Sequence, residues 1–552
     1  MPAPTGRPQT SQESAARGRS RMVANLLGTD QPVDLLLVVA TLTIFVGLDL
    51  ATRALSNIPS HRLDQRSLLV EAIGANRLLF LITGVGVVVA SVAWRTRFWS
   101  RWTELEHGRA LRVLAIGFLF VLTWRGSLYE YNFLLDQTHV LDRALLAVFA
   151  VGSIYRPILL APVALQSRVI AAQFAYPFGT TAGQNIDELI VIGVLILAAV
   201  HLKFVLTGIG GTSIVLLLLS AALASHFFIP GRSKMAIGWL GDNEIFNLPL
   251  SGFTAGWLGE TDGGWARALS GAALPFNIVL LVSTLLLELG AGLAVIHYRL
   301  MRIWLIGAIT FHLVLFAAIG FWFLSWLVME VGLLVMFFAP SLREWVATNS
   351  TPARAVLTFL LVVVAGAVVF HPPRLAWLDA PVSYGYRLEA TGSSGSKYRL
   401  PASAFSPLTQ ELTFVRMAPS GITPAIGGYG AAGPDRFEQL HSVATRQELQ
   451  MLEPTADPFV VSASGELLTR FMDYANSHGQ SVWEHLAPPD HFWTGSSDRS
   501  YRFEEPLRRI DVYLLTALHS GSSQNLARRR VMTLELDQAG RARIAYRQPA
   551  VP

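Results

Sequence analysis

The chain has no cysteine among its 552 residues, and few of its residues carry charge. The lack of cysteine excludes disulfide bonds, thiolate metal sites and cysteine nucleophiles. Only 15% of the residues are charged, whereas an ordinary soluble chain has about 25%. At the same time 52% of the residues are hydrophobic. This shortage of charge indicates that much of the chain lies in a lipid bilayer.

Long apolar runs are concentrated between residues 34 and 370. The hydrocarbon core of a bilayer is about 30 Å thick, so a helix that crosses it needs about 20 mostly apolar residues. We therefore predict an all-α polytopic membrane bundle with nine or ten hydrophobic segments. The candidate segments are roughly residues 34–52, 74–93, 111–124, 141–162, 187–206, 209–229, 274–296, 303–319, 321–338 and 354–370.

Composition divides the chain into three predicted parts. Residues 1–32 are rich in arginine and lack an apolar stretch, so we expect a basic cytoplasmic tail and not a cleaved signal peptide. Residues 33–371 form the predicted transmembrane domain. After Pro372 the composition turns polar, which predicts a small soluble α+β domain over residues 372–552. Its expected strands are at 384–388, 396–400, 508–518 and 530–536, with a helix at 466–476 and a loop at 420–434.

The net charge of +5 comes largely from arginines in short loops beside apolar segments, so it predicts topology and not nucleic-acid binding. The basic loops at 95–112, 156–168 and 299–302 should be cytoplasmic. If 187–206 and 209–229 both crossed the membrane, residue 299 would fall outside, so we expect one of these two segments to be broken, re-entrant or laid against the bundle. On this map the C-terminal domain is extracytoplasmic.

Lys234 follows an apolar run that we expect to end at Pro230-Gly231. A lysine near an apolar boundary can lose its proton, because desolvation disfavours the ammonium form, and the neutral amine is a usable general base. The alternative is an interfacial lysine whose amine reaches out to water.

Glu288 and His312 also lie within apolar segments, where ionisable side chains are costly and by default mark function or a buried pair. Small residues after Glu288 allow close helix packing, so its carboxylate can point into the bundle. Each residue has a structural alternative. Glu288 can pair with an arginine or histidine, and His312 can donate a hydrogen bond between helices.

A further polar group comprises Asp136, His139, Asp142 and Arg143, at the entrance of the 141–162 segment. Asp142 and Arg143 have a plain alternative as capping and interfacial charges. The group becomes part of a site only if it folds against Lys234.

These residues resemble a family, the vitamin K-dependent gamma-carboxylase-like membrane proteins that share the horizontally transferred transmembrane (HTTM) domain. Gly231-Arg232-Ser233-Lys234-Met235 with Trp239 resembles the family's Gly-x-x-Lys-Leu followed by a tryptophan. The run 285–292 is similar to its Leu-Leu-Leu-Asp-Leu-Ser-Ala-Gly, with Glu288 in place of the aspartate. Phe311-His312 resembles its Phe-His pair, and the run 134–138 its Leu-Leu-Asp-Lys-Thr segment. The matches occur in the family's order and cover about residues 34–345.

The resemblance implies a carboxylase-like lyase or quinol oxygenase, in which Lys234 takes a proton from a reduced quinone of the vitamin K or menaquinone type. Glu288 and His312 would complete the catalytic group. The implied quinone pocket includes Trp239, His139, Asp136, Asp142 and Arg143. The implied partners are membrane lipid, the quinone and an extracytoplasmic peptide or protein, with no metal and no nucleic acid.

The family's Asn-His-x-Tyr element is replaced here by Asp142-Arg143-Ala144-Leu145. A second interpretation therefore stays open, namely a non-catalytic membrane protein that binds a lipid or quinone or anchors its ectodomain for partner interaction. A transporter would show related halves, and the sequence has no such internal symmetry.

Overall fold

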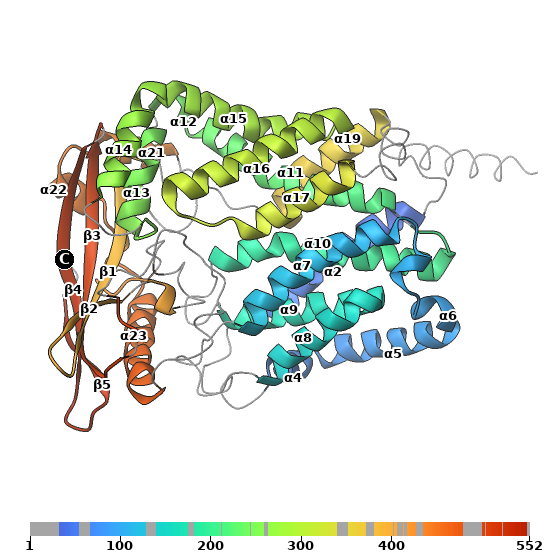
Figure 1. The fold of residues 1–552 in the computed structure, drawn as a ribbon, viewed down its shortest axis with the longest axis horizontal. Helices are drawn as coiled ribbons and strands as arrows, with labels where there is room; N and C mark the ends of the chain where they lie inside the picture. The colour runs from blue at the N-terminus through green and yellow to red at the C-terminus, as the bar shows by residue number, and fades with distance from the viewer. Residues whose placement is uncertain are drawn as a thin grey trace, which may run out of the picture.

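The structure is a computed structural model in which most of the chain is helical and a small antiparallel sheet lies near the C-terminus (Figure 1). It describes residues 33–53, 67–128, 140–174, 182–210, 212–242, 244–258, 263–338, 352–370, 380–400, 402–405, 412, 417–426, 434–478, 500–502, 504–521 and 523–548.

The apolar part of the chain folds into a bundle whose long helices lie roughly side by side (Figure 1). The helices of its first half are α2 (Val33–Arg53), α4 (Leu68–Ala75), α5 (Arg77–Ala93), α6 (Arg95–Phe98), α7 (Gly108–Leu128), α8 (Val140–Tyr155), α9 (Leu160–Phe174), α10 (Ala182–Thr207) and α11 (Thr212–Ala236). The second half contains α12 (Trp239–Asp242), α13 (Leu248–Ala255), α14 (Gly264–Ala273), α15 (Asn277–Ala294), α16 (Tyr298–Ile319), α17 (Leu324–Phe338), α19 (Pro352–Leu360) and the π-helical segment η6 (Leu361–Phe370).

Helix α11 lies at the centre of the bundle and packs against α10, α15, α17 and η6. Small residues allow this close packing. A Cβ added to Gly366 of η6 would lie 2.8 Å from the Cβ of Ser225, and one added to Gly292 of α15 would lie 3.0 Å from the ring of Phe228. Without such glycines the neighbouring helices would stand further from α11.

The predicted count of nine or ten crossings is not supported. In the described part of the chain, five helices are long and apolar enough to cross a membrane, or six if the bent pair α4 and α5 is one span. Four further apolar helical stretches in the described residues are shorter, at 10–17 residues each. They are Leu36–Leu48, Pro157–Ala171, Leu324–Phe338 and Val356–Phe370.

Two details of the predicted helices differ in the structure. The segment 141–162 is not one helix but two, α8 and α9, joined at Arg156 and a short 3-10 turn (η3, Pro157–Leu159) and packed against each other. A proline removes a backbone donor and disfavours helical geometry in the residue before it, so the chain turns there. The segments 187–206 and 209–229 are both helical without a break, since α10 and α11 are long continuous helices.

The C-terminal region is an α+β structure, as predicted. Its antiparallel sheet has the order β2-β1-β3-β4-β5, and its helices lie between β2 and β3 in sequence. The four expected strands and the expected helix are present. The strands are β1 (Val382–Gly392), β2 (Lys397–Leu400), β3 (Leu507–Ser520), β4 (Ser523–Leu536) and β5 (Ala542–Arg547), and the helices are α21 (Pro434–Ser442), α22 (Arg446–Met451) and α23 (Pro458–His478).

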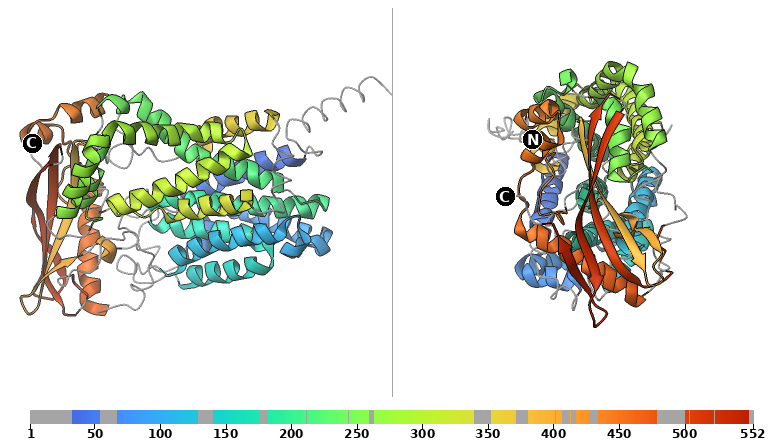
Figure 2. Two further views of the ribbon diagram at one scale, coloured as in Figure 1. Left: turned by 45° about the horizontal axis from the view of Figure 1, so that its top comes forward. Right: turned by 90° about the vertical axis from the view of Figure 1, so that its left-hand side faces the viewer.

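The sheet packs against the end of the bundle where α13 and α14 lie, and its strands run across that end (Figures 1 and 2). The contact is close at Gly385 of β1, where an added Cβ would lie 1.9 Å from the backbone oxygen of Thr254 in α13. Beside it, the amide of Gln524 in β4 donates to the hydroxyl of Thr254 at 2.6 Å. The C-terminal region is therefore attached to the bundle through α13.

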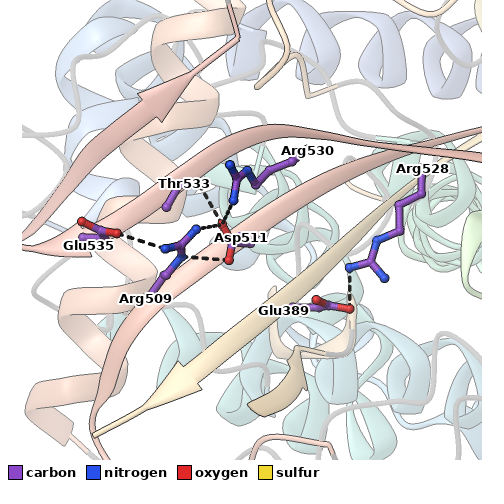
Figure 3. Close-up of polar contacts among 7 residues, drawn as sticks. All are labelled: Glu389, Arg509, Asp511, Arg528, Arg530, Thr533 and Glu535. Atoms are coloured by element: carbon purple, nitrogen blue, oxygen red, sulfur yellow. Dashed lines mark hydrogen bonds and ion pairs between the residues drawn. The ribbon is translucent and has the colours of Figure 1, made fainter. Parts of the chain in front are cut away.

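A polar network covers one face of this sheet (Figure 3). Arg509 donates to both carboxylate oxygens of Asp511, at 2.8 and 2.9 Å, and Thr533 donates to the same carboxylate at 2.7 Å. Arg528 pairs with Glu389 at 2.6 Å. Such part-exposed pairs each contribute at most about 1 kcal/mol to folding stability. The network therefore does little to stabilise the sheet, and its main effect is to make this face polar.

Candidate functional site

A cavity lies between α11, α15, α16 and α17, and it brings together polar side chains that are far apart in the sequence. Its walls are mostly apolar and aromatic. The residues that line it are His226, Phe227, Pro230, Lys234, Trp239, Ile245, Leu248, Thr284, Glu288, Phe311, His312, Leu315, Ile319, Phe323 and Trp326.

Lys234 reaches this cavity from the last turn of α11, which ends at Ala236. We expected the apolar run to stop at Pro230-Gly231, but α11 continues to Ala236 with Pro230 inside it. A proline inside a helix removes one helical hydrogen bond and crowds the carbonyl four residues earlier, but packing against neighbouring helices can hold such a helix together. At this position α11 packs against α15 and η6. Lys234 is consequently held on a packed helix and is only 6% exposed.

The amine of Lys234 forms a short contact with Glu288. Its Nζ lies 2.5 Å from Glu288 Oε1, and both side chains are buried. The same Nζ lies 5.0 Å from the ring centre of Trp239, close enough for a cation–π interaction. The second oxygen of Glu288, Oε2, is buried and has no hydrogen-bond partner among the described residues. The pair therefore leaves one carboxylate oxygen of Glu288 that can still accept a hydrogen bond or a proton.

His312 forms a second acid–base pair on the other side of the cavity. Its Nδ1 lies 2.8 Å from Oε1 of Glu330 in α17, and Glu330 is fully buried. Aromatic rings enclose the imidazole, with Phe323 stacked on it at 4.7 Å and Trp326 edge-on at 5.0 Å. A carboxylate beside one ring nitrogen can set the orientation of a histidine, and Glu330 lies at that position beside His312. The sequence analysis did not select Glu330 as a site residue.

His226 is a third polar residue of the cavity that the sequence analysis did not select. It is 1% exposed and its Nδ1 lies 2.7 Å from the carbonyl oxygen of Ala222, one turn earlier in α11. Its Nε2 is buried and has no partner in the described part of the chain. The only signal in the sequence is that His226 and Lys234 are eight residues apart on one helix, roughly two turns.

Asp142 and Arg143, which the resemblance placed in the pocket, do not line the cavity. Asp142 accepts hydrogen bonds from the backbone amides of Leu68 and Leu69 at the start of α4, at 2.9 and 3.0 Å, so it caps that helix. Arg143 donates to the carbonyl oxygen of Ser127 in α7. Both belong to the α4, α7 and α8 side of the bundle, and the alternative of capping and structural charges describes them better.

His139 and Asp136 lie outside the described residues, so the structure does not place them. Of the predicted site residues that it does place, Lys234, Glu288, His312 and Trp239 line one cavity. No group of three histidine, aspartate or glutamate residues suited to a metal ion occurs in the described ranges.

The C-terminal region contributes a side chain next to this cavity. Phe437 of α21 is buried in a small apolar cluster with Trp239, Ile245, Leu281 and Leu285. Trp239 belongs both to this cluster and to the cavity lining. The end of the cavity near Lys234 is therefore packed against the C-terminal region.

No protein-family model, curated protein or solved structure matches the chain, so the candidate site rests on its own geometry.

Proposed function

We propose that this chain is a multi-pass membrane protein that binds a quinol in the cavity between α11, α15, α16 and α17, and that the Lys234–Glu288 pair accepts a proton from the quinol. The observation that carries the proposal is the convergence of Lys234, Glu288 and His312 on one apolar cavity. These are the residues that the carboxylase-like resemblance implies as its catalytic group.

Membrane insertion is supported by apolar side chains on the outside of the bundle. Helix α5 exposes large aliphatic residues along its length, and soluble proteins rarely expose so continuous an apolar surface. The exposed residues of α5 include Leu78, Leu81, Ile82, Val85, Val88 and Val92. We propose that these side chains face lipid.

The proposed orientation of the bundle in the membrane follows from the position of the loops that carry arginine. Arg156, between α8 and α9, donates to the carbonyl of Trp99, and Arg97 lies against Gly208 at the end of α10. The connections before α7, between α8 and α9 and after α10 thus meet at one end, away from the sheet (Figure 1). Basic loops are retained in the cytoplasm, so we propose a cytoplasmic N-terminal tail and an extracytoplasmic C-terminal domain.

The proton chemistry follows from the two buried groups of the pair. An amine and a carboxylate together have two proton sites, and an ammonium–carboxylate pair fills one of them. When a quinol hydroxyl loses its proton, the O–H bond breaks and the proton fills the second site, on Glu288 Oε2. The quinolate then remains beside the Lys234 ammonium, whose charge stabilises it strongly in an apolar cavity.

A second function has one specific observation in its favour. The Lys234 ammonium is already engaged by Glu288 at 2.5 Å, which also suits a purely structural pair in a protein that holds a quinone or lipid without reacting with it. The two functions differ in what happens to bound quinol.

The test is to purify the full-length protein and its Lys234→Ala variant in detergent and to follow the oxygen-dependent loss of reduced menaquinone. We expect turnover in the wild type and loss of at least 100-fold in the variant, since removing a group that stabilises the developing charge costs about 10²–10³ in rate. Equal turnover in both proteins would refute the role of Lys234. Binding without turnover would establish the non-catalytic function.

A further inference from the structure

The tautomer of His226 is fixed by the helix that carries it. A backbone carbonyl can only accept a hydrogen bond, so Nδ1 of His226 must carry the proton that bridges the 2.7 Å to the oxygen of Ala222. In the neutral imidazole the other nitrogen, Nε2, is then an acceptor only. This acceptor is buried and unpaired within the described residues, and His226 lines the cavity.

Trp326 of α17 offers the complementary group. Its indole Nε1 is a donor only, it is also buried without a partner in the described part of the chain, and Trp326 lines the same cavity. The His226 and Trp326 rings meet edge-on with their centres 5.7 Å apart. Two neighbouring rings in the wall of one cavity therefore carry one unpaired acceptor and one unpaired donor.

Buried polar atoms without partners cost about 1–3 kcal/mol each, so native proteins rarely keep them unless a ligand or water completes their hydrogen bonds. A hydroxyl group matches this pair, because it donates one hydrogen bond and accepts another. A carbonyl oxygen can accept from Trp326 but cannot donate to His226.

We propose that His226 and Trp326 form a hydroxyl-binding subsite, in which Nε2 of His226 accepts from a ligand hydroxyl and Nε1 of Trp326 donates to the same oxygen. This inference rests on the proposed function and specifies its ligand: the subsite selects the reduced form of a quinone over the oxidised form. The recognition is separate from the Lys234–Glu288 pair, which acts on the proton.

The test measures the dissociation constants of menadiol and menadione, under anaerobic conditions, for the full-length protein in detergent. We expect the wild type to bind menadiol about tenfold more tightly, in line with one net hydrogen bond. His226→Leu removes the acceptor, so it should weaken menadiol binding about tenfold, leave menadione binding unchanged and abolish the preference. His226→Gln, whose amide can turn to donate to a carbonyl, should tighten menadione binding.

Ser225→Ala is the matched control. Ser225 is the buried neighbour of His226 and does not line the cavity. Its hydroxyl donates to the Ala222 carbonyl and lies 3.4 Å from Nδ1 of His226, the ring nitrogen that does not take part in the proposed subsite. This variant should retain the affinity for both forms.

Trp326→Phe provides a second measurement if His226→Leu does not fold. It removes the donor but keeps an aromatic ring, so both affinities should fall by a similar factor and the preference should stay. A wild type that binds both forms equally, or a preference that survives His226→Leu, overturns the subsite but not the proposed function. No binding of either form overturns both.

Discussion

Gly231 of α11 lies so close to Glu288 of α15 that an added Cβ would be 2.8 Å from the Glu288 Cβ and 3.3 Å from the backbone nitrogen of Leu289. Lys234 follows Gly231 by three residues, so it projects from nearly the same face of α11. The absence of a side chain at Gly231 therefore sets the distance across which the Lys234 amine reaches the Glu288 carboxylate.

Gly231→Val should separate α11 from α15 and weaken the Lys234–Glu288 contact. Because the new side chain meets backbone atoms that cannot move aside, we expect a loss of about 1–3 kcal/mol in the free energy of unfolding, typical of overpacking. Quinol turnover should fall as well. Thermal unfolding of the protein in detergent measures the first effect.

Gly290→Ala provides the matched control on α15, because an added Cβ there meets no atom within 4 Å. Alanine is the better helix former, so this variant should be as stable as the wild type or slightly more stable. If Gly231→Val were no less stable than Gly290→Ala, the close approach of the two helices would not matter for stability.

The buried pair predicts a non-additive double mutant. Lys234→Met or Glu288→Leu alone leaves an unpaired buried charge, which typically costs about 3–5 kcal/mol. The double variant should recover most of that loss in stability, because two apolar side chains leave no unpaired charge in the bundle. It should nevertheless have no quinol turnover. A double-mutant cycle by thermal unfolding measures the coupling, and additive losses would show that the two side chains do not interact.

Hydropathy predicted that the apolar segments would be helical, because a backbone in an apolar environment must satisfy its hydrogen bonds internally, but it did not predict the number of helices long enough to cross a membrane. The division of 141–162 into α8 and α9 had a signal that hydropathy ignores, the Arg156-Pro157 step, since a proline disfavours the helical conformation in the residue before it. The short edge strand β5 was missed because its exposed side chains do not alternate between apolar and polar.

The candidate site was only partly predictable. Lys234, Glu288 and His312 stand out because an ionisable residue in an apolar run is costly and therefore informative. Glu330 has the same signal, but its role depends on a contact with a neighbouring helix that no spacing in the sequence reveals. Asp142 was selected from the sequence as a pocket residue, but in the structure it does not line the cavity. Its charge caps α4, which precedes it by about 70 residues in the chain, and that partner is visible only in three dimensions.

Glu330→Gln tests whether the carboxylate orients His312. An amide keeps the size of the side chain but can turn to donate to Nδ1, which would allow the other tautomer of the imidazole. We expect quinol turnover to fall at least tenfold with little change in thermal stability, and the pH profile of turnover to shift. The pH profile separates this role from simple packing, because a purely structural Glu330 would alter stability but leave the profile unchanged.

His519 of β3 predicts a pH dependence confined to the C-terminal sheet. Its Nε2 lies 2.9 Å from the hydroxyl of Ser383 in β1, and burial lowers the pKa of His519 to about 4 from its usual 6.5. Between these values the unfolded chain binds a proton that the folded chain does not, so the contribution of His519 to stability is complete above pH 6.5 and is lost as the pH falls toward 4.

The sheet should therefore open more readily at pH 5 than at pH 7, and hydrogen exchange of β1 and β3 peptides, corrected for the intrinsic effect of pH, should show it. His519→Leu should make protection equal at the two pH values, because no titrating group remains at that position. Ser383→Ala keeps the imidazole buried and should retain the difference. A pH effect that persists in His519→Leu would assign it to another group, since the desolvated imidazole is the specific cause of the expected loss.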